Sequence, residues 1–137
     1  MIHEEIVTFE VAKLAKEKGF GEMVSCYQGY RKDGTLFYFS NMPDGRERIM
    51  QTDCLAPTQS LLQRWLLEEK KYAISVFWDM LSKAYYYEIV KTLGVLEIPV
   101  EEKSNYFSPK GFDTYEFALE DALKYTLENL VKTCGKH

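Results

Sequence analysis

The residues best suited to chemistry lie on two stretches of alternating character, residues 74–80 and 85–90. If these stretches form a hairpin, one face of it carries Phe77 and Asp79 on one strand and Tyr86 and Glu88 on the other, because side chains alternate between the faces of a strand. Two acids beside two aromatic rings could hold a cationic or hydrogen-bond-donating ligand. The same face could also form a homodimer, or it could be covered by helices with its charges at the rim. Of the three alternatives, we favour burial beneath helices.

The groups that most catalytic and metal sites need are scarce. The two histidines, His3 and His137, stand near the chain ends, which are poor positions for a general base. Phosphate-binding and hydrolase motifs are absent from the sequence. The least weak enzymatic alternative is a metal-dependent activity at Asp79 and Glu88. We therefore expect no catalytic residue, no metal site and no cofactor, and we favour a non-enzymatic protein.

Composition limits the partners and the compartment. The 137 residues suit one domain, 1–137, and the net charge of −4 disfavours nucleic acid as a partner. Three scattered cysteines, Cys26, Cys54 and Cys134, indicate free thiols in a reducing compartment. Neither a signal peptide nor an apolar run long enough to span a membrane occurs, so we expect a cytoplasmic protein without a membrane partner.

The first half of the chain predicts a helix and a hairpin. The apolar period predicts a helix from Glu4 or Phe9 to Lys18, stopped by Gly19, and Thr8 is the N-cap if the helix starts late. Residues 23–30 and 35–40 then predict two strands. The turn between them is either a tight Asp-Gly turn or a three-residue loop over residues 32–34.

A second helix and a second hairpin follow. Pro57 suits the first position of a helix that ends near Lys70 or Lys71. For the second hairpin, a loop over residues 81–84 pairs Met80 with Tyr85 and continues in register along both strands. The polar side of the helix is formed by Gln59, Gln63, Arg64 and Glu68.

The rest of the chain predicts a long connection and a last helix. Residues 92–112 form the connection, in which residues 95–100 could add an edge strand. The last helix runs from Asp113 or Thr114 to about Lys132. Phe117 points away from its buried stripe, on the side of Glu120, Asp121 and Lys124, and with Val131 it could contact a partner. The predicted buried stripe is Tyr115, Leu119, Ala122, Leu123, Thr126 and Leu130.

The element order α-β-β-α-β-β-α predicts an α+β fold. We expect two layers, with an antiparallel or mixed sheet built from both hairpins and the helices mainly on one face.

Three stretches resemble a family of small uncharacterised proteins encoded by phages and prophages of gut bacteria. They are residues 9–20, residues 56–66 and residues 113–120, and the run from Pro57 to Leu66 is the most specific of them. Phe117 departs from the acidic residue that the family has at that position. The resemblance carries no activity and no cofactor, and it implies only an accessory role inside a bacterial cell. It also directs attention to Gln59, Ser60, Gln63 and Arg64, polar residues that the fold itself does not require.

Abundant aromatic residues without catalytic groups lead to two functional hypotheses. The first is an interaction module that binds a host protein or its own copy as a homodimer. The second is a binding protein for a small molecule such as a nucleotide signal, in which arginine and lysine side chains would pair with phosphate. The cations considered for this second role are Arg31, Arg46, Arg48 and Lys71.

Overall fold

Among the described residues, groups of three strands separate the helices along the chain. The computed structural model describes residues 4–21, 28–38, 53–92 and 105–131. In chain order the elements are α1 (Phe9–Glu17), β1 (Gln28–Tyr30), β2 (Leu36–Tyr38), β3 (Cys54–Leu55), α3 (Gln59–Lys70), β4 (Tyr72–Asp79), β5 (Ala84–Lys91), β6 (Tyr106–Phe107), α4 (Tyr115–Tyr125) and a π-helical turn, Thr126–Leu130.

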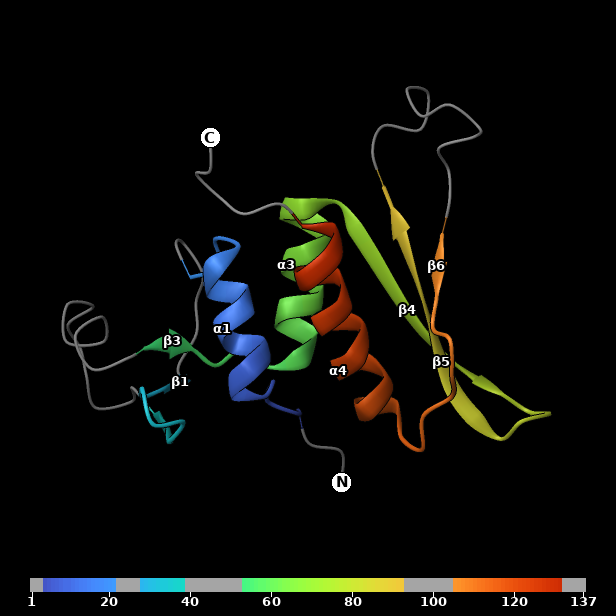
Figure 1. Ribbon diagram of the computed structural model, residues 1–137, viewed down its shortest axis with the longest axis horizontal. Helices are drawn as coiled ribbons and strands as arrows, with labels where there is room; N and C mark the ends of the chain where they lie inside the picture. Colours follow the sequence, from blue (N-terminus) through green and yellow to red (C-terminus); the bar gives the residue numbers. More distant parts are fainter. Residues whose placement is uncertain (1–3, 22–27, 39–52, 93–104, 132–137) are drawn as a thin grey trace.

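The α+β class is confirmed, but the two hairpins belong to different sheets. One antiparallel sheet has the order β2-β1-β3 and the other has the order β4-β5-β6. Figure 1 shows α1, α3 and α4 between the small sheet on one side and the larger sheet on the other. The expectation of one common sheet was wrong because the helices lie between the two hairpins (Figure 1), and β1 pairs instead with β2 and β3. With two residues, β3 is too short to give an alternating pattern.

Each of the three helices begins after a threonine N-cap. Thr8, Thr58 and Thr114 accept hydrogen bonds from backbone N–H groups of the first turns of α1, α3 and α4. The late start of the first helix and the start of the last helix are thus confirmed. Pro57 was expected inside the second helix, but it precedes the Thr58 cap.

Gly19 ends α1, as the sequence predicts. Gly19 has a φ of 104°, its N–H donates to the Lys16 carbonyl at 3.1 Å, and the Phe20 N–H donates to the Ala15 carbonyl at 2.9 Å. These two bonds form a Schellman motif. The motif turns the buried Phe20 ring back toward Trp65, at 5.2 Å between ring centroids.

The first hairpin uses the longer of the two turns that the sequence allows. Arg31 donates to Thr35 and Gly34 to Arg31, which leaves a three-residue loop over residues 32–34. Gly34 takes a φ of 89°, the conformation that this loop needs at its last position. The predicted strand positions 23–27 and 39–40 lie outside the described residues.

The second hairpin has the predicted faces but a register two residues away from the prediction. Trp78 pairs with Tyr85 and Asp79 pairs with Ala84, so the loop covers residues 80–83. The Asp79 carboxylate fixes this loop by accepting from the Ser82 N–H and hydroxyl. A shift of two residues keeps every side chain on its face, which is why the alternating pattern could not detect it.

The last helix changes its winding before it ends. After α4, the N–H of Val131 donates to the carbonyl of Thr126 at 3.0 Å, which closes a π-helical turn. The wider turn buries Leu127 and Val131, whereas Val131 was expected on the exposed side with Phe117. Tyr115 was predicted to be buried, but it is 41% exposed.

The long connection contributes one strand to the larger sheet. Tyr106 pairs with Ile89 and Phe107 with Glu88, which makes β6 an edge of that sheet. The predicted strand at residues 95–100 lies outside the described residues.

One hydrophobic cluster joins the three helices and both sheets. It contains Val11 and Ala15 of α1, Leu62 of α3, Tyr87 of β5 and Leu123 of α4. None of the described helices has the length and apolar character that a bilayer crossing requires.

Candidate interaction site

The predicted face of the second hairpin exists, but its two acids lie apart. Phe77 is opposite Tyr86, and their rings stack with centroids 6.3 Å apart. Glu88 pairs with Ser75, and Asp79 lies four residues beyond Ser75 on β4. The carboxylates of Asp79 and Glu88 are therefore separated by roughly 13 Å along the sheet. Asp79 is also engaged by Ser82, whose hydrogen bonds lower the pKa of the carboxyl group. The pair therefore cannot hold one ion.

This outer face is not covered by the described helices, contrary to the favoured expectation. The helices lie against the opposite face of the larger sheet (Figure 1), where Ile74, Tyr87 and Ile89 are buried. On the outer face, Phe77 is 43% exposed and Phe107 is 57% exposed.

Of the three α3 residues predicted to bind a partner, Gln59 and Gln63 instead link elements of the fold. Gln59 is 4% exposed, and its amide nitrogen donates to the Glu116 carbonyl at 3.0 Å and to the Glu120 carboxylate at 2.9 Å. Gln63 donates to the Ile74 carbonyl of β4 at 2.8 Å. Only Arg64 is exposed, in an ion pair with Glu68 at 2.8 Å.

Phe117 is exposed as predicted, with 62% of its surface accessible. Its expected neighbours are partly engaged elsewhere. Glu120 accepts from the Thr8 N–H at 2.8 Å as well as from Gln59, and Asp121 accepts from the Tyr87 hydroxyl at 2.7 Å. Phe117 is therefore a single exposed ring beside residues that hold the helices together, which is ordinary for a surface aromatic residue.

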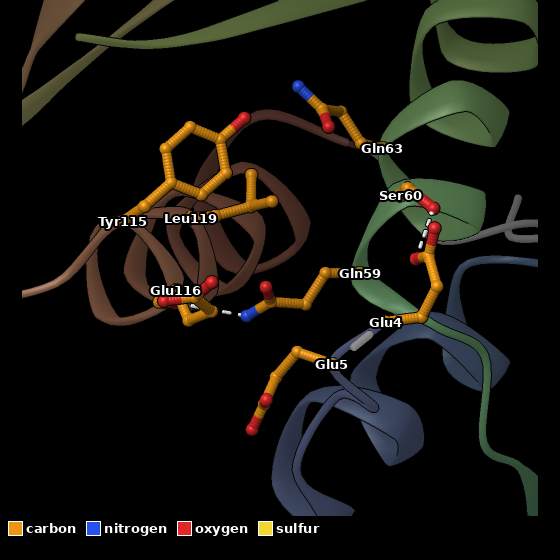
Figure 2. Close-up of a pocket in the computed structure, with 8 residues that line it drawn as sticks. All are labelled: Glu4, Glu5, Gln59, Ser60, Gln63, Tyr115, Glu116 and Leu119. Carbon is orange, nitrogen blue, oxygen red and sulfur yellow. Dashed lines mark hydrogen bonds between the residues drawn. The ribbon is translucent and has the colours of Figure 1, made fainter. Parts of the chain in front are cut away.

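A groove runs along the polar side of α3. A cavity of about 390 Å³ lies between the first turns of α3 and α4, and a second cavity of about 250 Å³ beside β4 shares its lining residues Ser60 and Gln63. We call the two together the α3 groove. Figure 2 shows the larger cavity, with side chains of α3 on one side and of α4 on the other. The α3 groove is lined by Glu4, Glu5, Gln59, Ser60, Gln63, Arg64, Leu67, Ala73, Ile74, Tyr115, Glu116 and Leu119.

The larger cavity of the α3 groove is acidic. Glu4, Glu5 and Glu116 border it, and Glu4 accepts from the Ser60 hydroxyl at 2.8 Å. Within the described part of the chain, the carboxylates of Glu5 and Glu116 have no ion-pair or hydrogen-bond partner. Among the described residues, no Lys, Arg or His lines this cavity.

The acidic lining disfavours a nucleotide ligand here. Phosphate needs cations, and the cations considered for that role stand elsewhere. Arg31 lies over the Phe37 ring at 4.3 Å, and the Lys71 ammonium donates to the Glu68 carbonyl. Arg46 and Arg48 lie outside the described residues.

The buried Gln59 amide has a fixed orientation. Its nitrogen faces two acceptors, a backbone carbonyl and a carboxylate, so the nitrogen and the oxygen cannot exchange places. The oxygen therefore points away from them, on the side of the cavity that Tyr115 and Gln63 border (Figure 2). Among the described residues it has no hydrogen-bond donor.

The outer edge of β4 is open next to this groove. β4 is the last strand of its sheet, and the Ile74 carbonyl points away from β5, because it accepts from Gln63 of α3. Backbone groups of an antiparallel strand alternate in direction, so those of Val76 and Trp78 point outward as well. Within the described residues no group pairs with them.

Exposed rings connect this open edge with the larger cavity. Trp78 is 48% exposed and contacts Tyr85 edge-to-face at 4.9 Å. The Tyr85 ring in turn packs edge-to-face against the ring of Tyr115 in the cavity wall, with centroids 6.1 Å apart. The edge therefore borders the α3 groove at Ile74, and Trp78 is linked to the cavity wall through Tyr85.

The sequence pointed to the polar side of α3 but not to the rest of this site. Glu4, Glu5 and Glu116 are far apart in sequence from Val76 and Trp78, and only the packing of α3 against α4 and β4 gathers them. Among the described residues, no group of three or more His, Cys, Asp or Glu side chains is arranged to hold a metal ion. Comparison of the chain with protein-family models, curated proteins and solved structures gives no significant match.

Proposed function

We propose that this protein is a non-enzymatic interaction module that binds an extended segment of a partner protein as an added strand on β4. The observation that carries the proposal is the outer edge at Val76 and Trp78, whose backbone donors and acceptors have no partner in the described part of the chain and lie beside exposed rings. Strand addition satisfies such groups, and pockets beside the strand select the side chains of the segment.

The energetics suit a reversible contact. Each backbone hydrogen bond adds about 0.5–1.5 kcal/mol net, so a few bonds at Val76 and Trp78 give only weak binding by themselves. Burial of the exposed Trp78 and Phe77 rings would add most of the remainder, since aromatic residues dominate binding hot spots. Unprotected edges are uncommon because they invite aggregation, and β4 carries no Lys, Arg or Pro that would block pairing.

The wider setting is part of the same proposal. The scattered cysteines support a reducing, cytoplasmic setting, and the resemblance to phage and prophage proteins supports a host protein as the partner. A second copy of the chain is the alternative occupant of the edge, which would make a homodimer.

A displayed library of random peptides tests the proposal. We expect peptides selected on the wild-type protein to bind with about micromolar affinity, and Val76→Pro to weaken them about tenfold or more. Proline removes the outward N–H of Val76 and leaves the β4–β5 hydrogen bonds, which involve the alternate residues, intact. Val76→Thr keeps the N–H and is the matched control, with binding within about twofold of wild type.

Hydrogen exchange gives a direct second readout. The amides of Val76 and Trp78 should exchange rapidly in the free protein and become protected when the peptide binds. Equal binding to wild type and Val76→Pro, or no protection of these amides, would overturn the proposal. A wild-type dimer that Val76→Pro converts to a monomer would also overturn it, in favour of a second copy at the edge.

A further inference from the structure

We infer that the partner segment places a lysine or arginine side chain in the larger cavity of the α3 groove. The inference rests on the proposed strand addition and names the chemistry of its partner.

The geometry of an added strand directs its side chains toward the groove. Side chains of neighbouring strands at paired positions point to the same face of a sheet. Residues of the segment that pair with Val76 and Trp78 therefore point to the face where the helices pack. The α3 groove begins on that face, bounded by Gln63 on one side and by Tyr115 on the other.

The lining of the cavity fits a cation. The carboxylates of Glu5 and Glu116 have no partner among the described residues, and the Gln59 oxygen has no donor there although Gln59 is 4% exposed. An ammonium or guanidinium group brings several donors and one positive charge, which complements acceptors of this kind. Tyr115 adds a ring at the border, to which a cation is attracted.

The chain itself does not supply this cation from the elements that border the groove. Arg64, the only cation among the described residues of the lining, lies toward the smaller cavity and pairs with Glu68. A second copy adding its own β4 would not supply it either, because Tyr72–Asp79 contains no Lys or Arg. Charge complementarity therefore favours a basic segment of another protein over a homodimer.

Synthetic peptides test the inference. A peptide from the selection that binds in a Val76→Pro-sensitive way is compared with a copy whose lysine or arginine is replaced by norleucine. We expect this replacement to weaken binding about tenfold, which corresponds to about 1.4 kcal/mol. We also expect the affinity of the basic peptide to fall with salt concentration, and that of the norleucine peptide to change little.

Matched protein variants locate the contact. The double variant Glu5→Gln and Glu116→Gln should remove the preference for the basic peptide. The double variant Glu17→Gln and Glu69→Gln changes the net charge equally at exposed positions outside the groove, and it should keep the preference. Urea unfolding of both double variants confirms that each is folded.

The outcomes separate this inference from the proposed function. Selected peptides that are sensitive to Val76→Pro but contain no enriched basic position would refute the inference and leave strand addition standing. A basic preference that persists in the Glu5→Gln and Glu116→Gln variant would refute the assigned cavity. Peptide affinity that is the same in wild type and Val76→Pro would refute the strand addition itself.

Discussion

Single side chains in this protein join elements that are distant in the sequence. Glu120 of α4 accepts from the Thr8 N–H before α1 and from Gln59 of α3, so one carboxylate links three helices. Tyr87 of β5 links the larger sheet to α4, because its hydroxyl donates to Asp121. Its burial and this hydrogen bond to a carboxylate raise the pKa of Tyr87.

Cys54 yields a prediction at the residue scale. The thiol is 3% exposed, and its burial, together with the nearby Asp53 charge, raises the pKa of Cys54 from 9.0 to about 11. The unfolded chain therefore loses this proton at lower pH than the folded protein does, so the stabilisation is complete below pH 9.0 and is lost as the pH rises through about 11. We expect the difference in unfolding free energy between wild type and Cys54→Ala to shrink over this interval. Urea unfolding at a series of pH values measures it, and a constant difference would contradict the prediction.

The helices start and stop at residues with specific backbone or capping geometry. All three start at a threonine cap, and α3 ends at Lys71 in the left-handed region, with a φ of 67°. That reversal sends β4 back along α3 and places Ile74 within reach of Gln63. The open edge and the groove thus both follow from the end of one helix.

The Thr8 cap gives the prediction at the element scale. Its hydroxyl accepts from the Val11 N–H at 3.3 Å, and its side chain is exposed, so replacement creates no cavity. Thr8→Ala should lower the free energy of unfolding by about 0.5–2 kcal/mol, whereas Thr8→Ser should lie close to wild type. Chemical denaturation compares the two. Equal losses in both variants would show that the hydroxyl does not stabilise α1.

At the scale of the whole molecule, one core holds two sheets on opposite sides of the helices. The buried cluster includes Phe20 and Cys54 near the small sheet and Ile74 and Tyr87 of the larger sheet. Contacts that run through the helices in this way favour a single cooperative unit.

The two tryptophans report on the two sides of the molecule. Trp65 contacts Phe20 near the small sheet, and Trp78 stands on the larger sheet against Tyr85. We expect the fluorescence transitions of Trp65→Phe and of Trp78→Phe, each with one remaining tryptophan, to coincide with the far-UV circular dichroism transition of the same variant in urea. Separate midpoints within one variant would show that the small sheet unfolds independently.

The sequence by itself determined the approximate positions of the helices, the Thr8, Gly19 and Thr114 boundaries, and the faces of the second hairpin. Caps, glycine turns and alternation act over a few residues, so they can be read from neighbouring positions. Tertiary structure alone decided that Gln59 and Gln63 are links between elements, that the hairpins lie in separate sheets, and that β4 keeps an open edge beside three glutamates. These features depend on contacts such as Gln59 with Glu116 and Tyr85 with Tyr115, which form between distant segments and leave no local pattern.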